Sequence, residues 1–133
     1  MTTPDVNKVI RAYLVTCGTL TTLIGGATPR IYCPRLPENA TLPAISFFTR
    51  GGDSNPNVPD VVDPSVQFDC WADNPIDARD VYNKLHDVLE GIQNITVGSS
   101  KILSAIQEGH GQDLPDEIPG YFRVLTFFKF KIV

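Results

Sequence analysis

The sequence is poor in the side chains that carry chemistry near neutral pH. Its 133 residues include two histidines, three cysteines and one tryptophan. An odd number of cysteines, at spacings that fit no metal template, indicates reduced thiols in a cytosolic product and no disulfide framework. No segment approaches the ~20 consecutive apolar residues of a membrane-spanning helix. These shortages predict a chain without a bound metal, a cofactor or a membrane span.

Positive charge is also scarce and scattered. Lys and Arg number 11 against 15 Asp and Glu, which leaves a formal net charge of −4. The arginines are dispersed along the chain, so no electrostatic footprint for nucleic acid is expected. The length of 133 residues and the 42% of hydrophobic residues fit a single domain, 1–133, with one core.

The sequence is organised around the stretch Ser65–Ile92. Its first part alternates apolar with polar residues and predicts a strand with one face on a core, the apolar members being Val66, Phe68 and Cys70. Asn74 and Pro75 then suit the N-cap and first position of a helix, which Gly91 ends. Apolar residues at steps of three and four give this helix one apolar stripe. A strand that leads directly into such a helix predicts two packed layers.

The other expected elements flank this pair. An amphipathic helix is predicted from Thr3 to Gly18, followed by a short helical turn over Thr19–Ile24. Extended segments are predicted over Arg30–Cys33, Ala44–Thr49, Ile95–Val97, Lys101–Gln107 and Tyr121–Val133. The predicted fold class is therefore α+β, a mostly antiparallel β-sheet with two α-helices packed on one face and long loops between strands.

Two of these loops are unusually long. The first spans Gly51–Pro64 and is rich in Gly, Pro and Asp, and the second spans Gly109–Gly120 and is acidic. Loops of this length are commonly functional or disordered. Together they hold five candidate binding residues, namely Asp53, Asp60, Asp63, His110 and Asp113.

A catalytic function finds little support. Cys70 and a histidine form a nucleophile–base pair in principle. Cys70 shares its strand face with apolar residues, however, and this favours a small buried side chain. His86 lies next to the apolar stripe of its helix, which favours a structural role.

His110 lies in an acidic cluster that could hold a divalent ion, with Glu108, Asp113, Asp116 and Glu117. The spacing fits no Ca²⁺ or Zn²⁺ template, so a solvated acidic loop is favoured. No enzymatic activity is therefore expected.

An ordered series of short motifs resembles a known family. The N-terminal helix leads to LTTLIGG at residues 20–26 and RIY at 30–32. LPENA at 36–40 and LPAI at 42–45 follow, and VQFDCWA at 66–72 precedes a helix that contains Ala78. In this order the motifs resemble the tail-completion, or tail-terminator, proteins of long-tailed (siphophage-type) bacteriophages and prophages, over roughly residues 5–130.

The resemblance implies a structural protein of the virion, assembled in the cytoplasm of the bacterial host. Members of the family form rings, commonly hexamers, that cap the finished tail tube and present a joining surface to the head connector. The implied partners are therefore copies of the same chain, the tail tube protein and the neck proteins, while the genomic DNA passes through without specific binding. Arg35, Arg50 and Trp71 are candidate anchors, although Trp71 also fits packing at the strand–helix corner.

The residues accommodate a ring in two ways. Paired aromatics such as Phe47–Phe48 and Phe127–Phe128 place apolar groups on both faces of a strand, and two helices cannot cover both faces. Six copies at −4 each would also carry about −24, a field that does not attract DNA. We expect the Asp residues of the first long loop, or the second long loop, to line or rim the channel.

Three other functions remain open. A head-completion or connector protein of the same neck differs little from a terminator at the level of sequence. A small enzyme would use Cys70, His86 or His110. A ligand-binding domain would have a pocket between helices and sheet.

Overall fold

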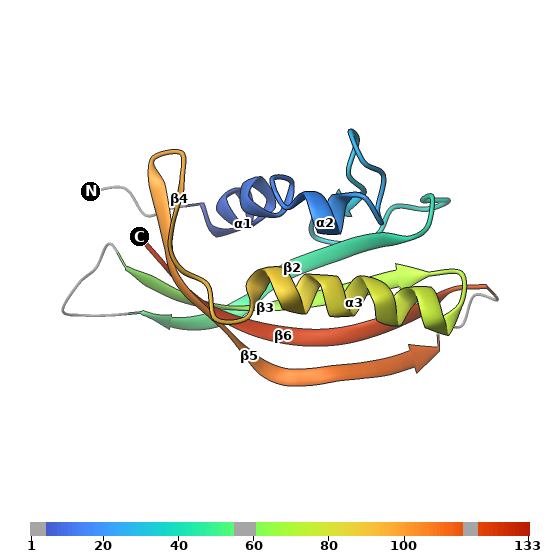
Figure 1. Cartoon of the computed structure of the whole chain (residues 1–133). Helices are drawn as coiled ribbons and strands as arrows, with labels where there is room; N and C mark the ends of the chain where they lie inside the picture. Colours follow the sequence, from blue (N-terminus) through green and yellow to red (C-terminus); the bar gives the residue numbers. More distant parts are fainter. Residues whose placement is uncertain (1–4, 55–60, 116–119) are drawn as a thin grey trace.

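The computed structural model describes residues 5–54, 61–115 and 120–133, and it places three helices on one face of a six-stranded sheet (Figure 1). The helices are α1 (Val6–Leu14), α2 (Gly18–Thr21) and α3 (Pro75–Leu89). The strands are β1 (Ile31–Tyr32), β2 (Ala44–Ser54), β3 (Val62–Ala72), β4 (Gln93–Val97), β5 (Ser100–Pro115) and β6 (Phe122–Ile132). None of the helices in these ranges is long and apolar enough to cross a membrane.

The sheet order is β1-β2-β3-β6-β5-β4. Every neighbouring pair is antiparallel except the short β1, which runs parallel to β2. The predicted α+β class with a mostly antiparallel sheet is confirmed. The third helix, α2, is the short turn that was predicted after the first helix.

Helices α1 and α3 each begin directly after a residue whose side chain caps the N-terminus of the helix. Asn74 caps α3 as predicted, because its Oδ1 accepts a hydrogen bond of 2.9 Å from the Asp77 amide, and Pro75 takes the first position. The cap of α1 is Asp5, whose Oδ1 accepts from the Lys8 amide at 3.3 Å. Thr3, at which this helix was predicted to start, lies outside the described residues.

The two long loops are shorter than predicted. Strand β2 continues to Ser54 and β3 begins at Val62, so both ends of Gly51–Pro64 are paired strand. Gly51 and Gly52 have φ of 104° and 137°, which lets the ladder pass through a bulge and resume with Gly52 opposite Pro64. Strand β5 likewise runs to Pro115, through most of Gly109–Gly120, with register shifts around Gly109. Glycine and proline at bulges interrupt a ladder without ending it.

The sheet curls around its helices. Helix α1 contacts both β2 and β4, which are four strand steps apart in the sheet. In a flat sheet this separation is roughly 19 Å, which exceeds the ~10–12 Å diameter of a helix. The edges therefore bend toward α1, and Figure 1 shows the β4 end rising beside it.

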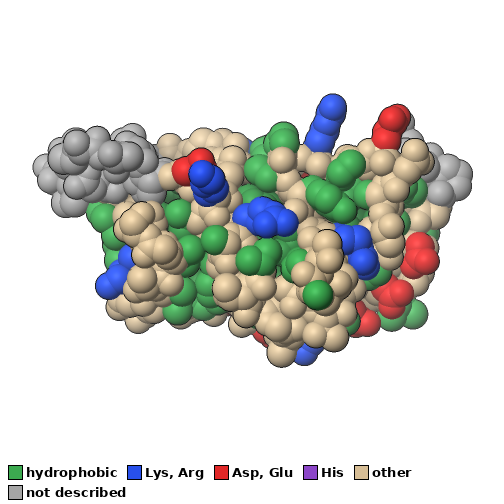
Figure 2. Space-filling view, turned by 90° about the horizontal axis from the view of Figure 1, so that it is seen from above, with side chains coloured by type: hydrophobic (Ala, Val, Ile, Leu, Met, Phe, Trp, Pro, Cys, Tyr) green, Lys and Arg blue, Asp and Glu red, His purple; other side chains and the backbone are tan. Residues whose placement is uncertain are grey.

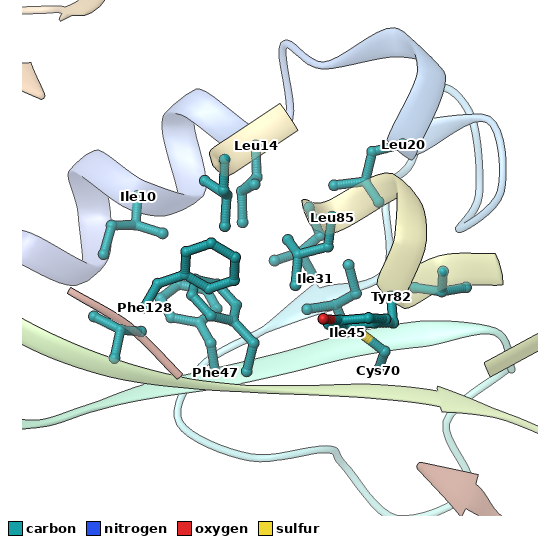
Figure 3. Packing of buried hydrophobic residues seen from close by; sticks show 14 of the residues in the cluster. Ile10, Leu14, Leu20, Ile31, Ile45, Phe47, Cys70, Tyr82, Leu85 and Phe128 are labelled. Atoms are coloured by element: carbon teal, nitrogen blue, oxygen red, sulfur yellow. The ribbon is translucent and has the colours of Figure 1, made fainter. Parts of the chain in front are cut away.

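The core fills the space between helices and sheet. Phe68 lies at its centre, with ring centroids 5.6 Å from Phe47, 5.8 Å from Phe128 and 6.2 Å from Phe130. Ile10 and Leu14 of α1 and Leu85 of α3 close over these rings (Figure 3). Cys70 is also fully buried, as predicted.

Candidate interaction surface

The face of the sheet opposite the helices, here the outer face, carries a row of aromatic and arginine side chains. Alternation along β6 buries Val124, Thr126 and Phe128 against the helices and turns the intervening residues outward. Strand register places outward residues side by side, with Phe127 opposite Gln67, Leu125 opposite Asp69 and Arg123 opposite Trp71. The outer face therefore comprises Ser46, Phe48, Arg50, Ser65, Gln67, Asp69, Trp71, Arg123, Leu125 and Phe127.

One half of the outer face is built on Arg50. Its guanidinium carbon lies 3.7 Å from the centroid of the Phe127 ring, and its Nε donates to Ser65 Oγ at 3.1 Å. Ser65 Oγ in turn donates to Glu108 Oε1 at 2.6 Å. These contacts hold an exposed arginine flat on an aromatic ring, which fixes its position in the absence of a partner.

The other half is built on Trp71 and Arg123. The Arg123 guanidinium carbon lies 5.3 Å from the centroid of the Trp71 ring, and Trp71 Nε1 donates to Ser46 Oγ at 2.8 Å. Tyr121 meets the Trp71 ring edge-on with centroids 6.3 Å apart. Trp71 is 9% exposed, so it is largely buried among these outer-face neighbours, and its predicted role as a partner-binding anchor stays a prediction.

Asp69 is a buried carboxylate in the middle of this half. Its side chain is 7% exposed, and its Oδ1 lies 3.5 Å from Arg123 Nη1. That separation makes an ion pair but no hydrogen bond, so Asp69 Oδ1 and Arg123 Nε are both buried without hydrogen-bond partners. Burial raises the pKa of Asp69, against the opposing effects of Arg123 and of a hydrogen bond from Gln67.

A surface cavity of about 440 Å³ lies at the Trp71 end of the sheet. Residues 35–39 line it together with Trp71 and Tyr121. Two of the predicted anchors, Arg35 and Trp71, are therefore brought together in one cavity. Cis peptide bonds precede Pro34 and Pro43 at the two ends of this segment.

A second cavity, of about 310 Å³, contains one of the predicted aspartates. Asp63 lines it with Glu108, Lys129 and Lys131. Asp53 is the strand partner of Asp63 in the β2–β3 ladder, and Asp60 lies outside the described residues. Asp63 is thus set among side chains of both signs, close to the Arg50 half of the outer face.

His110 and Asp113 lie apart from these cavities, at the seam between β5 and α3. His110 is exposed and meets the Tyr82 ring edge-on with centroids 6.0 Å apart. Asp113 Oδ1 forms an ion pair of 2.9 Å with Arg79 Nη2 and lines a hollow of about 200 Å³ beside Pro75 and Ala78. That volume is below the ~300–1,000 Å³ of typical ligand pockets.

The described residues offer little for metal binding or nucleophilic chemistry. Within ranges 5–54, 61–115 and 120–133, no group of three or more His, Cys, Asp or Glu side chains could hold a metal ion. Burial raises the pKa of the Cys70 thiol far above its ordinary value, so the thiolate is disfavoured. His86 packs against Tyr82 and Phe128, with ring centroids 6.2 and 6.4 Å away.

The side of the molecule that carries the helices differs from the outer face in its side chains. Viewed from above, apolar side chains are spread among Lys and Arg side chains, and acidic side chains gather at the right-hand end (Figure 2). This is the end at which α3 begins in Figure 1. Three exposed aspartates belong to this end, namely Asp73, Asp77 and Asp80.

Sequence reasoning missed Asp69, Tyr121 and Arg123 as members of a site. Tyr121 and Arg123 alternate in the sequence with apolar residues of the predicted extended segment, which puts both on the face away from the core. An arginine and two aromatics in one outward row were the available signal, because these residue types are enriched in protein interfaces.

No protein-family model matches the chain, and no curated protein matches its sequence. Among solved structures, the fold is similar to that of a chain in the virion of a native gene transfer agent (GTA) particle, with a TM-score of 0.65. The sequences are 14% identical, and the match covers 96% of this chain and 97% of that one. The likeness shows a shared fold over nearly the whole of both chains, while the resemblance to tail terminators stays a prediction.

Proposed function

We propose that the protein is a structural component of a phage-like virion, in which it forms a ring on the end of the tail tube. The observation that carries this proposal is the end-to-end likeness of fold to a chain of the GTA virion. It agrees with the independent resemblance of the sequence motifs to tail terminators. The ring stops further addition of tube subunits and provides the surface to which the head joins.

The outer face supports a role in assembly. The helices of the described ranges leave it uncovered, and it carries Phe127, Tyr121, Arg50 and Arg123 around the largely buried Trp71. Aromatic residues and arginine dominate the binding energy of protein interfaces. A protein that acts by shape and charge complementarity needs no reacting group, and the buried Cys70 fits that requirement.

Partners follow from the position in the virion. The ring contacts copies of itself, the tube protein below and the neck proteins above, and DNA passes through the centre without specific binding. The expectation that acidic residues rim the channel is retained for Asp63 and the second long loop.

Tube growth in vitro tests the proposal. Tube protein from the same phage or prophage is polymerised with and without the purified chain, and tube lengths are measured by electron microscopy. We expect shorter tubes with rings at one end. Tubes of unchanged length with bare ends would refute the terminator function, and binding to isolated portal or connector rings instead would identify a head-completion protein.

A further inference from the structure

Helix α3 begins with an apolar side chain that the described residues leave mostly exposed. Ile76 is 74% exposed, the largest value among the large hydrophobic residues of the described ranges. It precedes Ala78 of the buried stripe by two residues, or roughly 200° of helical rotation, so it points away from the core. Burying such a side chain is worth roughly 1.5–3 kcal/mol. The Ile76 side chain, here called the knob, is therefore available for contact with a partner.

The surroundings of this knob are acidic. Asp73, Asp77 and Asp80 are exposed and within one turn of Ile76 along the chain. An apolar centre within a charged rim is the usual composition of an interface hot spot. The complementary site must therefore be apolar in its centre and carry positive charge at its rim.

The 440 Å³ cavity on the outer face has an apolar centre and one arginine at its rim, next to one glutamate. Its apolar lining is Leu36, Pro37, Trp71 and Tyr121, and its charged lining is Arg35 and Glu38. Arg35 is exposed and takes part in neither ion pair found among the described residues. Trp71 and Tyr121 supply flat walls that a branched aliphatic side chain can pack against.

The knob and the cavity lie at the same end of the molecule but on opposite sides of the sheet. Trp71 is the penultimate residue of β3, and its side chain is on the outer face. Ile76 follows four residues after β3 ends, at the start of the helix that covers the other face. A surface on one side that fits a surface on the other side makes a head-to-tail contact, which closes into a ring when the rotation permits. In a ring whose axis is parallel to the strands, neighbouring copies lie at the same level along the axis. The Ile76 side chain of one copy would then lie level with the cavity of the next copy.

We infer that the first turn of α3 of one copy docks, through Ile76, into the Trp71–Tyr121–Arg35 cavity of the next copy. The occupant of the cavity is thus a second copy of this chain. This inference rests on the proposed ring, since it names the contact from which the ring is built. Asp80 faces Arg35 across the contact, and Glu38 on the same rim opposes it.

Association of the whole chain tests the contact. Mass is followed by light scattering over a concentration series, alone and with tail tubes present. We expect Ile76→Asp to reduce the association constant at least tenfold, whereas Val133→Asp, at a site that is 38% exposed and outside the contact, leaves it unchanged. Arg35→Glu and Asp80→Lys should each weaken association, their combination should restore it, and Glu38→Gln should strengthen it. Equal losses in the Ile76 and Val133 variants would overturn the inference.

Cross-linking in trans keeps the test decisive if the free chain is monomeric. One preparation carries Ile76→Cys and a second carries Leu36→Cys, both with the exposed Cys33 replaced by Ser. Oxidation of the mixture on tube ends should give a disulfide-linked dimer that neither preparation gives alone. Rings on tubes without this dimer would refute the contact and leave the proposed function standing. A dimer from chains that ignore tubes would establish the contact and refute the tail function.

Discussion

Arg50 lies flat over Phe127, with its guanidinium carbon 3.7 Å from the ring centroid, although the two residues are on strands separated in the sheet by β3. The hydrogen bond from Arg50 Nε to Ser65 Oγ bridges the intervening strand. This pair positions a positive charge on the outer face, where the helices do not reach.

Arg50→Glu tests whether this charge serves folding or binding. Because the pair is solvent-exposed, its loss should change the free energy of unfolding by no more than about 1 kcal/mol. Binding to tail tubes, measured by co-sedimentation, should fall at least tenfold. Lys8→Glu makes the same charge change on the exposed side of α1 and should bind normally. A large loss of stability with normal tube binding would show that Arg50 serves folding and not binding.

Asp69 should make stability depend on pH in a direction unusual for a carboxylate. Burial raises its pKa above the ordinary 3.8, so the folded state holds this proton more tightly than the unfolded state. The favourable contribution is complete below the unfolded pKa and is lost as pH rises through the raised folded pKa. Asp69→Asn removes this term, so the variant should gain stability relative to the wild type as pH rises from below the ordinary pKa of 3.8.

Urea unfolding of both proteins over a series of pH values that starts below 3.8 measures the difference. A variant that loses stability relative to the wild type as pH rises would show that the ion pair with Arg123 outweighs burial.

Local pattern predicted the strand–helix unit over 65–92 well, because alternation, capping and the apolar stripe are all set by neighbours in sequence. The predicted bounds of the two long loops were wrong, because they depend on residues that are distant in the sequence. Gly51, Gly52 and Pro64 are turn residues when considered singly, and they stay in strands here because a bulge matches them across the β2–β3 ladder. Pairing partners far along the chain decide such cases.

The sequence indicated single candidate residues but no surface that joins them. Arg35 and Trp71 were both identified, yet only the course of the 33–43 segment brings them to one cavity. Asp69 and Arg123 are 54 positions apart in the sequence and meet because β3 pairs with β6. Sheet order is a property of the whole fold, and no motif in the chain encodes it locally.

Tyr13 connects the first helix to the third. Its hydroxyl donates to the Val88 carbonyl at 2.6 Å, and burial, followed by the nearby Cys17, raises its pKa to about 12. Tyr13→Phe should cost about 0.5–1.5 kcal/mol of unfolding free energy, the usual net worth of one such hydrogen bond. The contribution of Tyr13 is complete below pH 10 and is lost as pH rises through about 12, so the cost should shrink over that interval. Tyr32→Phe, at a half-buried tyrosine, is the matched control, and an equal cost there would contradict the assignment.

Phe68 is the residue on which the aromatic core depends. Phe68→Ala should destabilise the fold by about 3–5 kcal/mol, because the ring contacts three other phenylalanines and the rigid sheet cannot collapse into the space. Ile106→Ala, on an exposed side chain, should stay within about 0.5 kcal/mol. Denaturant unfolding followed by circular dichroism measures both, and a loss below about 1 kcal/mol for Phe68→Ala would contradict the packing described here.

Gly111 is required by the close approach of Tyr82. A Cβ at this position would lie 2.6 Å from Tyr82 Cζ, and the Gly111 amide donates to the Tyr82 hydroxyl at 3.1 Å. Gly111→Ala should therefore push the ring away, break the bond from Gln107 Nε2 to the same hydroxyl, and cost about 1–3 kcal/mol. In a Tyr82→Ala background the same substitution should cost little, because the clash is gone and the two effects are not additive. Gly18→Ala, where a Cβ meets nothing within 4 Å, is the control and should not destabilise. Equal costs of Gly111→Ala in both backgrounds would show that the strain lies in the β5 backbone and not in the contact with Tyr82.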